Sequence, residues 1–123
     1  MLTLHRVRTS YVEEHTRLIN QLRGLLAEYG LVFAKGPRSF HRHWQQRRPT
    51  LNELVPALAL NEFDQLYQRL SAITEQIHDY DRRLTRMARD NEASKALMER
   101  DGIGPITASA VVATIGDGHD FKN

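Results

Sequence analysis

The chain has 123 residues, of which 41% are hydrophobic, 26% are charged and 7% are aromatic, and it contains no cysteine. The absence of cysteine excludes a disulfide framework and a Cys-based zinc site. The other proportions argue against disorder and favour an extended helical protein over a sheet sandwich. No apolar run approaches the roughly 18 residues that span a bilayer, so we expect no membrane partner and a cytoplasmic location. Residues 1–50 carry nine Lys or Arg against three Glu, a net charge of +6, which indicates a polyanionic partner.

The apolar pattern predicts a first helix over residues 2–29. Glu14 and His15 interrupt the apolar stripe, and Gly30 suits the position just after a helix end, where a positive φ is common. We expect this helix to lie antiparallel to a later one. The stripe recurs at intervals of three and four and consists of Leu4, Val7, Tyr11, Leu18, Leu22, Leu25 and Tyr29.

A basic segment follows at residues 34–50, and we expect it to form a loop. It contains no acid, and its basic residues alternate with aromatic rings and histidines, a composition suited to phosphate neutralisation and base stacking. For Trp44 the alternative is packing against the helices, and we favour contact by the arginines over stacking by Trp44. The candidate nucleic-acid-binding residues are Lys35, Arg38, Arg42, Trp44, Arg47 and Arg48.

Residues 61–90 carry the most regular pattern in the chain. Apolar residues repeat every 3.5 positions between polar neighbours, which predicts a left-handed coiled coil rather than the wider apolar face of a globular bundle. A short helix at 51–60, started by Thr50 and Glu53 and bent by Pro56, is expected just before it. We assign oligomerisation to this heptad seam: Phe63, Leu66, Leu70, Ile73, Ile77, Tyr80, Leu84 and Met87.

The last part predicts a short helix at 93–100, a glycine turn and a second helix to Ile115, followed by a loop over 116–123. Gly102 suits a left-handed helix cap, and Pro105 suits the first turn of a new helix. This arrangement is typical of a helix-hairpin-helix motif, whose backbone N–H groups bind phosphate. A tight turn that only packs two helices is the alternative. The candidate contacts are Gly102, Ile103, Gly104 and Thr107.

We find no active site in the sequence. His41 with His43, and Asp117 with His119 and Asp120, lack further ligands at recognisable spacing, so we assign no metal. No catalytic triad, phosphate loop or paired carboxylates in an apolar pocket can be identified. We therefore assign neither catalytic residues nor a cofactor.

Several ordered segments together resemble the bacterial insertion-sequence transposases related to the pilin-gene invertase Piv. They are residues 6–8, 17–30, 102–110 and 115–117, and Phe121. The resemblance implies a parent protein of the DEDD/serine type, with an acidic RuvC-like domain first, a coiled coil next and a C-terminal transposase domain that supplies a serine. It also implies oligomers guided by a structured RNA. The acidic domain and the serine segment are missing from this sequence, so no catalytic residue is carried over, and whether the chain acts as an enzyme stays open.

We therefore expect an all-α fold, with a long antiparallel helical hairpin or coiled coil followed by a helix-hairpin-helix element. Residues 1–90 would form the arm, including the basic loop 34–50, and residues 91–123 would begin a truncated transposase domain. The expected function is oligomerisation and nucleic-acid binding in DNA transposition, as a homodimer or higher oligomer with DNA and a guide RNA as partners. The alternative is a purely structural coiled-coil assembly module. Closure of the hairpin within one chain or between two chains stays open.

Overall fold

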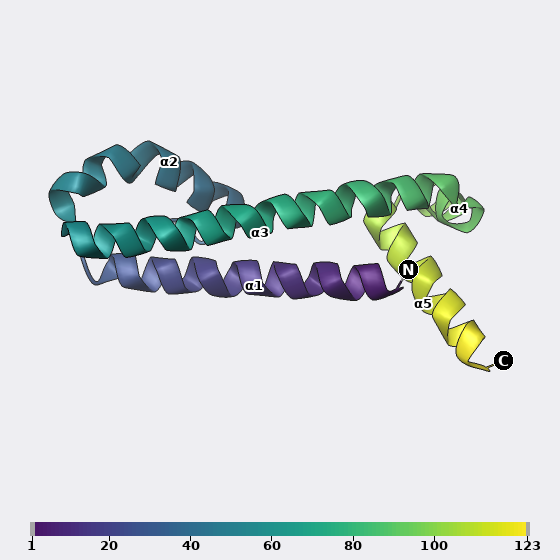
Figure 1. Cartoon of the computed structure of the whole chain (residues 1–123). Coiled ribbons are helices and arrows are strands. Elements are labelled where there is room, and N and C mark those ends of the chain that lie inside the picture. The colour runs from purple at the N-terminus through teal and green to yellow at the C-terminus, as the bar shows by residue number, and fades with distance from the viewer. Residues whose placement is uncertain (1, 123) are drawn as a thin grey trace. The chain divides into compact units, whose positions relative to one another are not determined.

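The structure is a computed structural model that describes the backbone of residues 2–122 and the side chains of residues 2–115. The described residues form helices and no strand, so the all-α prediction is confirmed (Figure 1). None of these helices is long and apolar enough to cross a membrane. The helices are α1 (Leu2–Ala27), α2 (Pro37–Leu54), α3 (Ala57–Asp90), α4 (Glu92–Asp101) and α5 (Pro105–Lys122).

The chain divides into two compact units, and α1 and α3 each contribute to both. The central unit comprises residues 12–74, and the terminal unit comprises residues 1–11 and 75–123. Within the central unit His15 of α1 bonds to Thr74 of α3, and Tyr29, just after α1, packs edge-on against Phe63. As the chain advances from position 15 to 29, its partner in α3 moves back from 74 to 63, so the two helices are antiparallel there.

The core of the central unit forms where α2 packs against the other two helices. One face of α2 buries Phe40, Trp44 and Leu51, which recur at helical spacing. Fully burying a side chain such as Phe40 stabilises a fold by about 1.5–3 kcal/mol. The buried apolar residues of this unit are Leu18, Ile19, Leu22, Leu26, Leu31, Phe33, Phe40, Trp44, Leu51, Val55, Leu60, Phe63, Leu70 and Ile73.

The expected loop at 34–50 is wrong, and so is the expected start of a separate helix at 51, although the interruption expected at Pro56 is present. The basic segment is helical from Pro37, because Gly36 and Pro37 start a helix and the apolar face of α2 then has a core to cover. The break falls at Val55 and Pro56, since a proline disfavours helical backbone in the residue before it. Helix α3 consequently begins at Ala57, four residues before the predicted start at 61.

In the terminal unit α1 and α3 are also antiparallel. Arg8 pairs with Asp81, and Tyr11 lies against Tyr80 with ring centroids 5.7 Å apart. Helix α5 packs against α4, and Ser109 of α5 shares a 3.0 Å hydrogen bond with the ring Nε2 of His5 in α1. The buried apolar residues here are Leu84, Ala88 and Ala108.

The predicted breaks around α4 are largely confirmed. Asn91 caps the start of α4 by accepting a 2.9 Å hydrogen bond from the N–H of Ser94, and Gly102 ends it with φ +66°. Helix α5 begins at Pro105, as expected. The loop predicted for residues 116–123 is wrong, because α5 continues to Lys122.

The heptad seam lies inward within the single chain. Phe63, Leu70, Ile73 and Leu84 are buried, and the other four seam residues are half-buried. The seam therefore supplies core contacts inside each unit.

Candidate nucleic-acid interface

The basic residues of segment 34–50 fall into two groups in the structure. Lys35, Arg38 and Arg42 are exposed, and in the part of the chain that the structure describes none of them forms an ion pair. Arg38 and Arg42 are four residues apart on α2, so they share one face of that helix. That face points away from the face that buries Phe40 and Trp44. Lys35 lies two residues before α2, and we call Arg38, Arg42 and this neighbouring cation the α2 basic face.

The α2 basic face adjoins the N-terminus of its helix. Gly36 is the N-cap residue and provides no side-chain cap, and its carbonyl accepts the first helical hydrogen bond from Phe40 at 2.8 Å. The backbone N–H groups at 38 and 39 have no partner within the helix, as is usual for a first turn. Unpartnered N–H groups, a positive helix dipole end and nearby cations together favour an anion such as phosphate.

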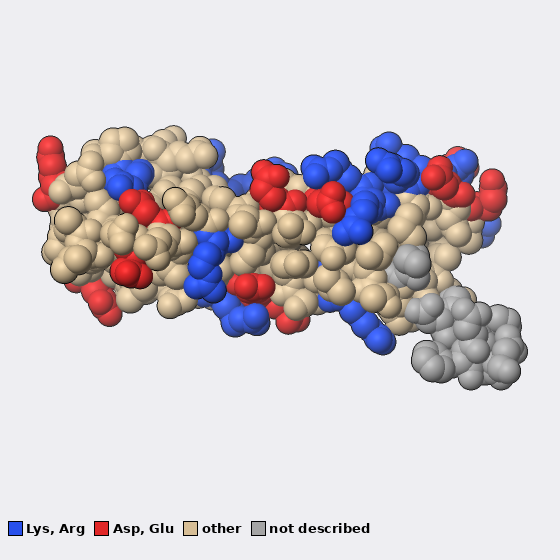
Figure 2. All heavy atoms as spheres, viewed as in Figure 1, with Lys and Arg blue, Asp and Glu red and all other residues tan. Residues whose placement is uncertain are grey.

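A second basic cluster was missed by the sequence reasoning. Arg82, Arg86 and Arg89 are exposed on α3 and, with Asp81, Thr85 and Asp90, line a shallow groove of about 430 Å³. Figure 2 shows Lys and Arg side chains gathered over this part of α3. The spacing of four and three residues could have revealed the cluster, but the net negative charge of residues 51–123 concealed it.

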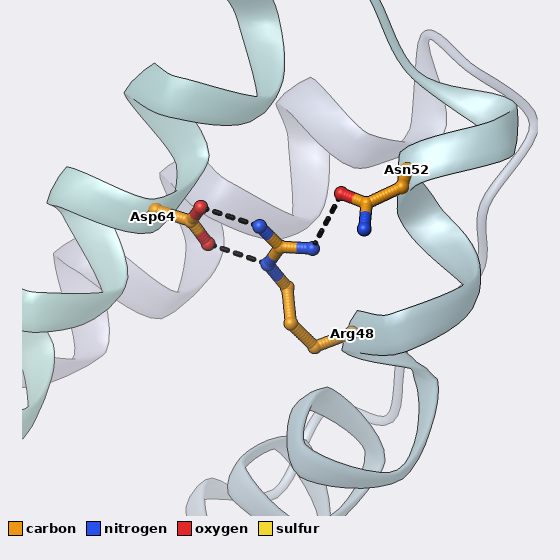
Figure 3. Close-up of polar contacts among 3 residues, drawn as sticks. All are labelled: Arg48, Asn52 and Asp64. Carbon is orange, nitrogen blue, oxygen red and sulfur yellow. Dashed lines mark hydrogen bonds and ion pairs between the residues drawn. The ribbon is translucent and has the colours of Figure 1, made fainter. Parts of the chain in front are cut away.

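Arg48 forms an ion pair inside the central unit. Its Nε and Nη2 donate to the two carboxylate oxygens of Asp64, each at 2.7 Å, and its Nη1 donates to Asn52 Oδ1 at 3.1 Å (Figure 3). The hydrogen bond to Asp64 raises the pKa of Arg48 above its ordinary value. Figure 3 shows the guanidinium lying between the side chains of Asp64 and Asn52. Arg48 therefore joins α2 to α3.

Arg47 and Trp44 also contact the protein itself. Arg47 donates to the carbonyl of Val32, and its guanidinium carbon lies 4.4 Å from the ring centroid of Phe33. Trp44 is 4% exposed and stacks on Tyr67 with centroids 4.7 Å apart and planes 15° apart. Trp44 thus adopts the packed position that was the alternative to base stacking.

The glycine turn, residues 102–105 between α4 and α5, leaves its backbone open. Gly102 and Gly104 are exposed, as is Thr107, and Ile103 is half-buried. A Cβ at either glycine would meet no atom within 4 Å. The carbonyl of Gly104 accepts the first hydrogen bond of α5, from Ala108 at 3.0 Å, so the N–H groups between them lie in the first turn of that helix.

The two histidines of the basic segment have different partners. His43 accepts a hydrogen bond at Nδ1 from the backbone N–H of Ala34 at 3.4 Å, whereas His41 faces His15 and Tyr67. Among the described residues, no group of three or more His, Asp or Glu side chains is arranged to hold a metal. The other candidates, Asp117, His119 and Asp120, lie outside the described side chains.

The chain is similar over nearly its whole length to transposases of bacterial insertion sequences. It is 33% identical to the transposase for insertion sequence element IS1111A of Coxiella burnetii, in an alignment covering 96% of this chain and 32% of that protein. It is 33% identical to the transposase for IS1328 of Yersinia enterocolitica, covering 98% of this chain and 35% of that protein. A probable family 20 transposase of Pseudomonas aeruginosa is 31% identical, with 98% and 36% covered. The chain spans about a third of the length of these relatives.

Neither a family model nor a solved structure matches the chain.

Proposed function

We propose that this chain is the helical arm of an insertion-sequence transposase and that it binds the phosphate backbone of DNA through the α2 basic face. The observation that carries the proposal is the similarity to three transposases over at least 96% of the chain. The exposed cations at the open N-terminus of α2 supply the chemistry, because contacts of this kind attach a protein to nucleic acid without reading its sequence.

A salt series with duplex DNA tests this proposal. Replacing Arg38 and Arg42 by Gln should weaken binding equally for unrelated sequences. It should also reduce the slope of log affinity against log salt by about 1.8, because each neutralised phosphate contributes about 0.9. Arg17→Gln with Arg69→Gln is the matched control, since both residues are exposed in the same unit and the net charge changes equally. If both double variants lost the same DNA affinity, net charge alone would explain the loss, and the proposed site would be overturned.

The glycine turn supports a second contact of the same kind, as in a helix-hairpin-helix motif. Two exposed glycines and the open first turn of α5 leave room for a phosphate to approach the backbone. Gly104 lacks the positive φ of Gly102, so an alanine fits there without strain.

Gly104→Ala therefore isolates the backbone approach. It should leave the melting temperature nearly unchanged while lowering DNA affinity, because the added methyl occupies the space that a phosphate would use. Gly24→Ala, at another glycine with open surroundings, should leave affinity unchanged. Wild-type affinity in Gly104→Ala would show that the turn serves only to pack α4 against α5.

For the heptad seam we propose closure of a coiled-coil hairpin within one chain. Burial of Phe63, Leu70, Ile73 and Leu84 inside the chain supports this role, and the antiparallel pairing seen within each unit agrees with it. Oligomerisation through the seam stays a prediction that light scattering can test. A monomer mass that does not change with concentration would rule it out, whereas a dimer that dissociates on dilution would support it.

The finer assignment is to the DEDD/serine type related to Piv and guided by RNA. It rests on the ordered resemblance of residues 6–8, 17–30, 102–110 and 115–117, and of Phe121. Competition between duplex DNA and the structured RNA of a related element would test the RNA part. Preference for DNA at every salt concentration would count against a guide RNA held by this arm.

A further inference from the structure

Three polar side chains converge inside the central unit, one from each of its helices. The Nε2 atoms of His15 in α1 and His41 in α2 lie 3.2 Å apart, and Thr74 Oγ1 in α3 lies 3.0 Å from the first and 3.4 Å from the second. We call these residues the imidazole triangle. We propose that the imidazole triangle is a binding site for a divalent transition metal of the zinc class.

The spacing of the three atoms carries the proposal. In tetrahedral coordination with bonds of about 2.0–2.1 Å, two ligand atoms are separated by roughly 3.3 Å. The three edges of the triangle, 3.0, 3.2 and 3.4 Å, scatter around that value. The triangle therefore has the dimensions of one face of a zinc tetrahedron, with the fourth position for water.

The hydrogen bonds around the triangle leave lone pairs on Thr74 and on His41. Thr74 donates its hydroxyl proton to the carbonyl of Leu70 at 3.0 Å, which leaves oxygen lone pairs for the centre. His41 Nδ1 lies 3.0 Å from the hydroxyl of Tyr67. Donation from this Nδ1 to the hydroxyl selects the tautomer with an unprotonated Nε2, as the outer partners of metal-binding histidines commonly do. The 3.0 Å bond between His15 and Thr74 is then donated by His15 Nε2, so metal binding must displace that proton.

The electrostatics of His15 agree with this reading. His15 is 6% exposed, and burial followed by the neighbouring His41 lowers its pKa below the ordinary value. Burial disfavours the charged form of the ring, and only the uncharged form can bind a metal. The three residues are 26 and 33 positions apart along the chain, which is why their spacing in the sequence gave no signal.

A site with two imidazoles and one hydroxyl should bind a metal more weakly than a four-ligand structural zinc site does. Its effect would be to tie α2 to α1 and α3, so bound metal should stabilise the central unit. The rival reading is a hydrogen-bonded histidine pair that shares a proton and binds no metal. This inference does not depend on nucleic-acid binding.

Titration of the chelator-stripped chain with Zn²⁺ and Co²⁺ at pH 7.5 tests the proposal. We expect one equivalent of either metal to bind, with the intense visible absorption of tetrahedral Co²⁺ and a rise in melting temperature with Zn²⁺. His15→Gln and His41→Gln should each abolish all three signals. His43→Gln, which removes a histidine of the same segment, and His78→Gln, which removes an exposed one, should keep them.

Thr74 provides a test that preserves both histidines. Thr74→Ser retains the oxygen and should retain binding, whereas Thr74→Val should weaken it at least tenfold. Should His15→Gln fail to fold by circular dichroism, nitrogen NMR of the histidine-labelled wild type decides the question. One equivalent of Zn²⁺ should shift the Nε2 signals of His15 and His41 alone. No saturable binding, or binding that persists in His15→Gln, would overturn the proposal in favour of the shared-proton pair.

Discussion

Replacing Arg48 by Gln separates a structural arginine from a nucleic-acid-binding one. The Arg48 side chain is 29% exposed and that of Asp64 is 35% exposed, so solvent screens their attraction in part. Exposed pairs contribute about 0.2–1 kcal/mol, and the two parallel 2.7 Å hydrogen bonds place this pair near the upper end. We therefore expect a loss of about 1 kcal/mol, or a fall of roughly 4 °C in melting temperature for a domain of this size.

A double-mutant cycle with Asp64→Asn measures the pair itself. Both single variants should lose similar stability, and the double variant should lose less than their sum, with a coupling energy of about 1 kcal/mol. DNA affinity should change little in Arg48→Gln, whereas Arg42→Gln should show the reverse, with unchanged stability and weaker binding. The reasoning from the ion pair would be refuted by two results together. The losses of stability in the two single variants would add up to the loss in the double variant, and Arg48→Gln would lose as much DNA affinity as Arg42→Gln.

Three further outcomes follow from burial and backbone geometry. Acidification should destabilise the fold, because unfolded histidine takes up a proton near pH 6.5 whereas His15, whose pKa is lowered in the fold, does not; the free energy of unfolding is therefore full above about pH 6.5 and falls from there toward the folded pKa. Thermal melts from pH 7.5 to 5 should show this loss of stability. A pH dependence that is unchanged in His15→Gln would contradict it. Leu70→Ala should cost about 2–5 kcal/mol in chemical denaturation because the side chain is fully buried, whereas Leu58→Ala, at an 88% exposed position, should cost under about 0.5 kcal/mol. Gly102→Ala should lower the melting temperature, because its φ of +66° costs an L-residue about 1 kcal/mol, and a stability equal to that of Gly104→Ala would show that the turn relaxes.

Much of the local structure could be predicted from the sequence because it depends on short-range chemistry. The positive φ of Gly30 and Gly102 and the start of α5 at Pro105 follow from what these residues allow in their own backbone. The heptad spacing likewise predicted which residues of α3 face inward, since helical periodicity alone decides which side chains share a face. Charge counts indicated segment 34–50 as the basic one, and Arg38 and Arg42 in it are exposed.

The tertiary structure decided which side chains remain available for a ligand. Residues 37–50 became helical because their apolar face could cover a core formed by residues distant in sequence. The local pattern carries little information about such a core. Arg48 is held by Asp64, 16 residues away, and His41 meets His15, 26 residues away. The sequence shows that arginines and histidines are present but not which residues they contact. Only folding determines which of them already have a partner within the protein, because partners are set by distance in space and not by separation along the chain.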